Sequence, residues 1–136
     1  MEGIGPMSQK PVELILMRQL ASSLAMPVFL VDAGGALAFY NEPAEALLGK
    51  RFDETGEMSV GEWASVWQPA ARDGTPLPAE RLPLPIAIAT RRPARGDFWI
   101  RGLDGQHRHI EVTALPLIRA TDELVGAVAV FWELPS

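Results

Sequence analysis

The chain has 136 residues, of which 48% are hydrophobic and 21% charged, and this predicts one globular domain and excludes a disordered chain. Acidic residues outnumber basic ones, 17 to 12, and the net charge of -5 argues against binding to nucleic acid or to an anionic membrane. The lack of cysteine excludes disulfides, cysteine zinc sites, iron–sulfur clusters and cysteinyl-flavin photochemistry. With no secretory signal and no apolar run long enough to span a bilayer, we expect a cytoplasmic protein.

The N-terminal region combines an irregular segment with an amphipathic one. Residues 1–11 contain glycine and proline without periodicity, which predicts a flexible arm. Over residues 12–26, apolar side chains recur at spacings of three and four, which predicts a helix with the stripe Leu14, Met17, Ala21 and Leu24. Because such a short helix is marginal alone in water, it must dock on the outer face of a sheet, on a second chain, or on both. We predict a parallel homodimer held by these four residues and the outer sheet face.

The next segment predicts a hairpin followed by a short helix. Residues 27–31 and 37–40 are apolar and β-rich, and turn-forming residues separate them. Asn41 is placed to cap a helix, and Gly49 is placed to end it. This part of the chain is therefore predicted to fold as strand, turn, strand and helix.

The remaining elements complete an α+β domain. A helical turn is predicted near residues 62–68 and a second short helix at 83–90. Three strands are predicted at 97–103, 106–117 and 124–133, the first two joined by a two-residue turn at Asp104–Gly105. This order of elements favours one antiparallel sheet with the short helices on one face. The last strand is apolar almost throughout, which predicts that both of its faces are covered.

Several segments, taken in order, resemble those of a PAS domain. They cover about residues 24–133 and comprise Pro27–Asp32, Gly35, Leu37, Tyr40–Asn41, Ala44, Leu47–Gly49, Asp73–Pro78, Leu82–Pro83, Leu103–Gly105, Ala114–Leu117 and Leu124–Gly126. The resemblance implies a PAS domain over 27–134, with a five-stranded antiparallel sheet and short helices that enclose a small cavity for a ligand or cofactor. It implies no enzymatic reaction, and it implies pairing through an N-terminal helix.

The predicted pocket residues follow from a count along the hairpin. A two-residue turn places Trp99 opposite Ile110, with Val112 on the same face. By resemblance, Val128 and Val130 join this inner face. The full set of predicted pocket residues is Trp63, Trp67, Ile86, Trp99, Ile110, Val112, Val128 and Val130. The alternative is that these residues are ordinary core, and a longer turn would exchange Trp99 for its neighbours.

The resemblance also bears on the cofactor. Flavin-binding PAS relatives carry Asn and Gln at the positions of Ile110 and Val128 together with a reactive Cys, and haem-binding relatives carry a His on the helix matching residues 83–90. This sequence has none of these. We therefore expect no cofactor, with flavin and haem disfavoured. A fatty acid or another small apolar ligand is the expected occupant if the cavity is filled.

An alternative site lies on the second strand of the last hairpin. His107, His109 and Glu111 occupy alternate positions on one face, the spacing of a His/His/carboxylate metal site. Packing and stacking on that face explain the pattern without a metal. Our main hypothesis is a stand-alone sensory module, not an enzyme, that binds a small apolar ligand and acts on a partner protein in trans. The alternatives are a ligand-free homodimerisation module and a small metalloenzyme.

Overall fold

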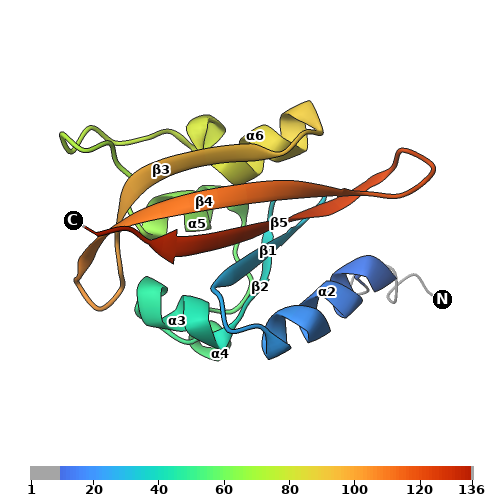
Figure 1. Ribbon diagram of the computed structural model, residues 1–136, viewed down its shortest axis with the longest axis horizontal. Helices are drawn as coiled ribbons and strands as arrows, with labels where there is room; N and C mark the ends of the chain where they lie inside the picture. The colour runs from blue at the N-terminus through green and yellow to red at the C-terminus, as the bar shows by residue number, and fades with distance from the viewer. Residues whose placement is uncertain (1–9, 136) are drawn as a thin grey trace.

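The computed structural model describes residues 10–135, so residues 1–9 of the predicted arm lie outside the described part. One five-stranded antiparallel sheet, with strand order β2-β1-β5-β4-β3, forms the centre of the fold (Figure 1). The strands are β1 (Val28–Asp32), β2 (Leu37–Tyr40), β3 (Ala94–Arg101), β4 (His107–Ile118) and β5 (Leu124–Glu133). The predicted α+β class and five-stranded sheet are therefore confirmed.

The helices divide between the two faces of this sheet (Figure 1). They are α2 (Val12–Ser23), α3 (Glu42–Leu48), α4 (Phe52–Thr55), α5 (Val60–Val66), the 3-10 turn η1 (Ala79–Arg81) and α6 (Pro83–Thr90). Side chains of α3, α5 and α6 pack on what we call the inner face, and α2 packs on the outer face. Among the described residues, no helix is both long and apolar enough to cross a bilayer.

The inner face carries the larger core. Strand alternation sends every second side chain to this face, where it meets the short helices. The strand residues of this core include Phe29, Val31, Ile100, Ile110, Val112, Ala114, Ala127, Ala129 and Phe131. Aromatic rings dominate its centre: Phe29 contacts Trp63 edge-on at a centroid distance of 5.2 Å. The large apolar area removed from water on this face makes it the main source of stability.

The outer face carries a smaller core beneath α2. Leu14 and Ala21 of the helix are buried against Val28, Leu30 and Val128 of the sheet. A Cβ at Gly126 would lie 2.8 Å from the Leu14 Cδ2 atom and 2.5 Å from the Val31 carbonyl oxygen. Glycine at this position is therefore what allows the helix to approach the central strand closely.

Asn41 joins the two faces. Its side-chain oxygen accepts hydrogen bonds from the backbone N–H of Val28 at 2.9 Å and of Ala44 at 3.3 Å, so it caps α3 as predicted. Its amide group donates to the carbonyl oxygens of Ala21 at 2.8 Å and Met26 at 2.9 Å. One buried side chain thus connects α2, β1 and α3.

Helix α2 is shorter than the predicted segment 12–26. It ends at Ser23, and Leu24 is already extended, with φ -87° and ψ 146°. Pro27 disfavours helical geometry at the residue before it, and the bonds from Asn41 hold the connection to β1 in place. The apolar periodicity continues beyond the helix because Leu24 still packs on the outer core.

Candidate functional site

An apolar cavity of about 70 Å³ lies between the inner face and the short helices. Its wall is formed by Phe29, Leu48, Trp63, Trp67, Pro69, Leu82, Pro83, Leu84, Phe98, Ile100, Ile110, Val112, Ala129 and Phe131. Four of the eight predicted pocket residues, Trp63, Trp67, Ile110 and Val112, are among them. All fourteen side chains are apolar apart from two indole N–H groups, so the cavity favours an apolar occupant.

Local sequence chemistry positions the two tryptophans. Ser59 and Glu62 form a capping box that fixes the start of α5. The Trp63 indole N–H then donates to the Gly35 carbonyl at 2.8 Å, and the Trp67 indole N–H donates to the Leu48 carbonyl at 2.9 Å. Both polar groups are therefore satisfied within the protein, and the rings present only carbon to the cavity.

The other four predicted pocket residues do not line the cavity. In the β3–β4 hairpin the last strand pair is Arg101 with His107, and the Gly102 N–H donates to the Gln106 carbonyl at 2.8 Å. Gly105 adopts φ +84° within this longer turn. The register is consequently shifted by one residue, and Trp99 pairs with His109 instead of Ile110. The predicted inward position of Trp99 is wrong for this reason.

The positions predicted for Val128, Val130 and Ile86 are also wrong. On β5 the inner residues are Ala127 and Ala129, so Val128 and Val130 face the side of α2. On α6 the buried residues that pack on the inner core are Leu84 and Ala87. Ile86 is not among the wall residues, to which α6 contributes Pro83 and Leu84.

The prediction missed several wall residues, among them Phe29, Phe98, Ile100, Ala129 and Phe131. Phe98 and Ile100 alternate along β3. A predicted turn longer by one residue would have placed both of them on the inner face. Ala129 and Phe131 alternate on β5, but the apolar residues between them conceal that period. Sequence spacing alone therefore could not assign the faces of β5.

The alternative metal site is not assembled. Within residues 10–135, no group of three His, Asp or Glu side chains lies close enough to hold a metal ion. The His109 Nε2 atom lies 2.7 Å from Asp97 Oδ2, and Glu111 forms an ion pair with Arg95 at 2.9 Å. The His109 ring also stacks on Trp99, with centroids 4.8 Å apart. This face of the hairpin is held together by pairing and stacking.

The predicted dimerisation residues pack on the protein's own sheet. Leu14 and Ala21 are buried, and Met17 and Leu24 are partly buried against the same outer core. Contact of these four side chains with a second chain stays a prediction, and within the single chain they lie against its own outer core. The opposite side of α2 exposes a different apolar set: Val12, Ile15, Leu16 and Leu20.

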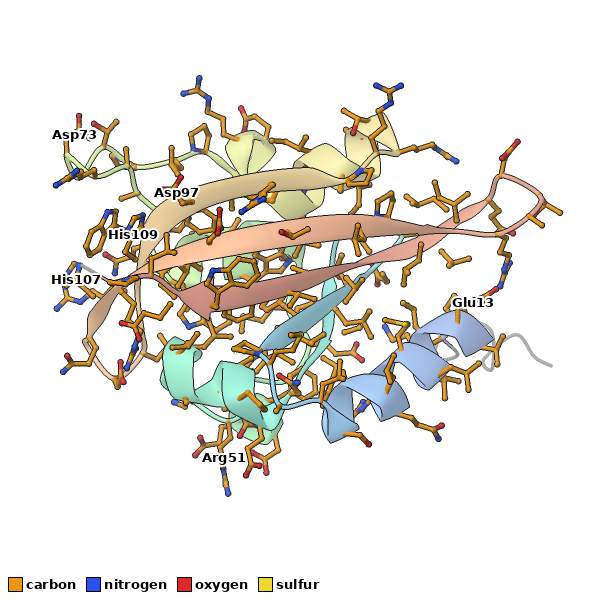
Figure 2. All side chains as sticks on the ribbon, viewed as in Figure 1. Glu13, Arg51, Asp73, Asp97, His107 and His109 are labelled. Carbon is orange, nitrogen blue, oxygen red and sulfur yellow. The ribbon has the colours of Figure 1, made fainter. Side chains whose placement is uncertain are left out.

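Polar contacts also hold α2. Arg119, at the end of β4, makes two hydrogen bonds to the Glu13 carboxylate, at 2.7 and 3.1 Å, and a third to Glu123 at 2.7 Å. Figure 2 shows Glu13 where the helix approaches the β4–β5 loop. The bond from Arg119 lowers the pKa of the Glu13 carboxyl, and the two carboxylates raise the pKa of Arg119. In the middle of the helix, the Arg18 guanidinium lies over the Phe39 ring at 4.5 Å.

Comparison with known proteins identifies the fold. No protein-family model and no curated protein matches the sequence. Among solved structures, the PAS domain of BvgS from Bordetella pertussis is 16% identical, with a TM-score of 0.61, and the alignment covers 91% of this chain and 87% of that one. The chain has the PAS fold.

The comparisons also correct the cofactor prediction. The light-oxygen-voltage (LOV) protein of Rhodobacter sphaeroides is similar with a TM-score of 0.71 and 12% identity, covering 92% of this chain and 69% of that one. A LOV domain whose mechanism was studied with a flavin analogue is similar with a TM-score of 0.65 and 11% identity, covering 96% and 89%. The prediction that flavin is disfavoured is therefore wrong, because flavin-binding LOV domains share this fold.

The cavity wall of this chain offers few polar groups. The polar edge of a flavin ring needs hydrogen-bond partners when it is buried. The only polar side-chain groups in the wall, the two indole N–H groups, already donate to backbone carbonyls. In this arrangement the wall therefore leaves no polar side-chain group free to pair with that edge.

Proposed function

We propose that this PAS-fold domain is a cytoplasmic sensory module whose cavity binds a small, mainly apolar ligand and which acts on a partner protein. The observation that supports the proposal most strongly is the cavity between the inner face and α5 and α6, which has an apolar wall. An apolar cavity of this kind excludes water and favours apolar ligands. No group on its wall is available for acid–base catalysis, so the proposed role is binding and not turnover.

The cavity volume limits the ligand. At about 70 Å³ it is smaller than the apolar cavity of ~150 Å³ that holds benzene in another protein. The ligand is therefore either smaller than benzene or displaces wall side chains as it enters. Displacement would act first on Phe131 and Ala129, which belong to the central strand β5.

Strand alternation provides a route by which ligand binding in the cavity would affect the outer face. Ala129 lies in the cavity wall, and its neighbour Val128 packs in the outer core with Leu14 of α2. A shift of β5 on ligand entry would therefore change the support beneath α2. In this proposal, the ligand state is transmitted to the partner as a change in the docking of α2.

Two matched variants, each with one alanine replaced by valine, test the ligand proposal. Ala129 and Ala127 are both buried on the inner side of β5, but only Ala129 contacts the cavity. We expect native and denatured mass spectrometry of the purified protein to reveal a small molecule in the wild type and in Ala127→Val, and none in Ala129→Val. Equal occupancy in all three proteins would contradict the proposal.

We further propose that the module is a homodimer, formed through the exposed stripe of α2. Val12, Leu16 and Leu20 follow one another at intervals of four residues, and Ile15 lies beside them. Leu16 and Leu20 are 57% and 52% exposed, so their burial would favour association. The same stripe supports the second candidate function, a homodimerisation module that binds no ligand.

Light scattering on two variants tests the dimer. We expect Leu16→Glu to give a monomer, because the carboxylate would be placed in the interface. Ser22→Glu adds the same charge to an exposed position of the same helix outside the stripe, and it should remain dimeric. Equal masses for the two variants would contradict the proposed interface.

A further inference from the structure

A second hollow lies on the surface beside β3, separate from the cavity in the core. It has a volume of about 570 Å³, within the usual range of small-molecule sites. One wall runs from the last turn of α5 into the segment that follows it, from Ala64 to Leu77, and the other wall comprises Trp99, Ile100, Arg101 and His107. We call this hollow the β3 groove.

Hydrogen bonds and a stacked aromatic ring hold the two walls of the β3 groove in place. The Ala70 N–H donates to the Trp99 carbonyl at 2.9 Å, and the Trp99 N–H donates back to the Ala70 carbonyl at 2.9 Å. The Arg101 N–H donates to the Trp67 carbonyl at 2.8 Å. The Trp99 ring is held by its stack on His109, whose Nε2 atom lies 2.7 Å from Asp97. The groove is therefore framed by paired backbone and by a fixed aromatic ring.

The charge in the β3 groove is of one sign. Its lining includes the guanidinium groups of Arg72 and Arg101 and contains no Asp or Glu. Within residues 10–135, Arg51, Arg95, Arg108 and Arg119 form ion pairs with carboxylates, whereas Arg72 and Arg101 do not. On a chain with a net charge of -5, two such guanidinium groups in one groove favour an anionic ligand.

The acidic residue next to Arg72 in the sequence does not neutralise the groove. The Asp73 carboxylate accepts the Thr75 backbone N–H at 2.9 Å and so closes its own turn. Asp73 is not part of the groove lining. Figure 2 shows Asp73 and His107 at the same end of the molecule. A carboxylate from outside the chain is therefore the partner that this charge arrangement favours.

The remaining lining residues define the body of the ligand. Ala64, Pro69, Ala70, Ala71, Pro76 and Leu77 give the groove an apolar floor. The Nε1 atom of Trp99 is the one buried side-chain nitrogen or oxygen without a hydrogen-bond partner in the described residues. Buried donors are normally paired, so this wall retains an unused donor.

We propose that the β3 groove is a second binding site, which takes a small carboxylate with a flat apolar body. Arg72 and Arg101 hold the carboxylate, and the apolar floor holds the body of the molecule. Pro69 and Ile100 belong both to this groove and to the wall of the core cavity. An occupant of the groove therefore presses on a wall that the two sites share.

Benzoate is the probe, and benzyl alcohol is its neutral counterpart of similar shape. In ¹H–¹⁵N spectra, we expect benzoate to shift the indole N–H signal of Trp99, assigned with Trp99→Phe, and benzyl alcohol to shift it at least tenfold more weakly. We expect the double variant Arg72→Gln/Arg101→Gln to weaken benzoate binding at least tenfold. Arg92→Gln removes an exposed arginine outside the groove lining and should bind as the wild type does.

The proposal is overturned if the Trp99 signal does not move with benzoate, if benzyl alcohol binds as tightly, or if the double variant retains the wild-type affinity. The spectrum of each variant also shows directly whether the protein is folded. Because the readout is Trp99 and not a residue of the core cavity, failure here leaves the ligand proposal for that cavity standing, and the reverse also holds.

Discussion

The two faces of the sheet are packed in different ways. On the inner face, several short helices and a cluster of aromatic rings form one large core, and the polar atoms of Trp63 and Trp67 are bonded to the backbone. On the outer face, a single helix rests on a small core, and a hollow of about 220 Å³ remains between α2 and β2. The inner face is thus a stable frame around a small cavity, whereas the outer face carries an element that can detach at lower cost.

The largest expected effect is a loss of stability, measured by replacing one tryptophan on each face of the sheet. Trp67→Ala removes a buried ring from the inner core and should lower the free energy of unfolding by about 3–5 kcal/mol. Trp132 lies at the end of β5 with 38% of its surface exposed, and Trp132→Ala should cost less than about 1 kcal/mol. Urea denaturation of both variants measures the difference. Equal losses would mean that the two faces contribute equally to stability.

The next effect concerns the residue that joins the faces. Asn41→Ala leaves the N–H groups of Val28 and Ala44 and the carbonyls of Ala21 and Met26 without their side-chain partner. Each unsatisfied buried group costs roughly 1–3 kcal/mol, so we expect a total loss of about 3 kcal/mol or more by denaturation. Gln19→Ala, at an exposed position of α2, should change stability by less than about 0.5 kcal/mol. A loss of that small size for Asn41→Ala would show that the connection is not needed.

A smaller and more local effect is expected for the docking of α2. Leu14→Ala should weaken the outer core by about 2–3 kcal/mol and speed amide hydrogen exchange in α2, while β4 and β5 stay protected. Leu16 is on the exposed side of the same helix, and Leu16→Ala should leave exchange unchanged in the monomer. Faster exchange throughout the sheet in Leu14→Ala would contradict the view that the outer face is a separate unit.

The smallest effect should come from the polar contacts of α2. Arg119→Gln removes the bonds to Glu13 and should increase exchange in α2 slightly, and less so at high salt. Because the pKa of Glu13 is lowered by this contact, its stabilising effect is present above the ordinary carboxyl pKa and is lost as the pH falls through the lowered value. The acid dependence of α2 exchange should therefore be weaker in Arg119→Gln than in Arg92→Gln. Identical pH profiles would show that the ion pair does not hold the helix.

Much of the fold could be predicted because local chemistry determines it. Asn41 and Gly49 bound α3 as predicted, since a cap and a left-handed residue, here φ +82°, have strong residue preferences. The helix at 83–90 and the strand at 124–133 agree with α6 and β5. The short elements α4 and η1, with four and three residues, carry too little periodicity to be predicted.

The candidate site was predicted less well because it depends on which face of the sheet each strand residue occupies. The predicted turn at Asp104–Gly105 was too short, which moved Trp99 to the wrong face. On β5, both faces are covered, so Val128 and Ala129 could not be distinguished by period. Helix α2 is apolar on two sides, and the sequence left open whether Leu14 meets the protein's own sheet, a second chain or both. In each case tertiary packing determines the face on which the side chain lies, and the spacing in the sequence does not.

Methyl NMR under xenon pressure tests the central claim, that the inner face of the sheet holds an accessible apolar cavity. Xenon enters dry apolar cavities, and Ile110 and Val112 line the cavity, whereas Val28 and Val128 lie in the outer core. We predict saturable shifts of the Ile110 and Val112 methyl signals and none for Val28 and Val128. Unmoved signals at Ile110 and Val112, or equal shifts on both faces, would contradict the account.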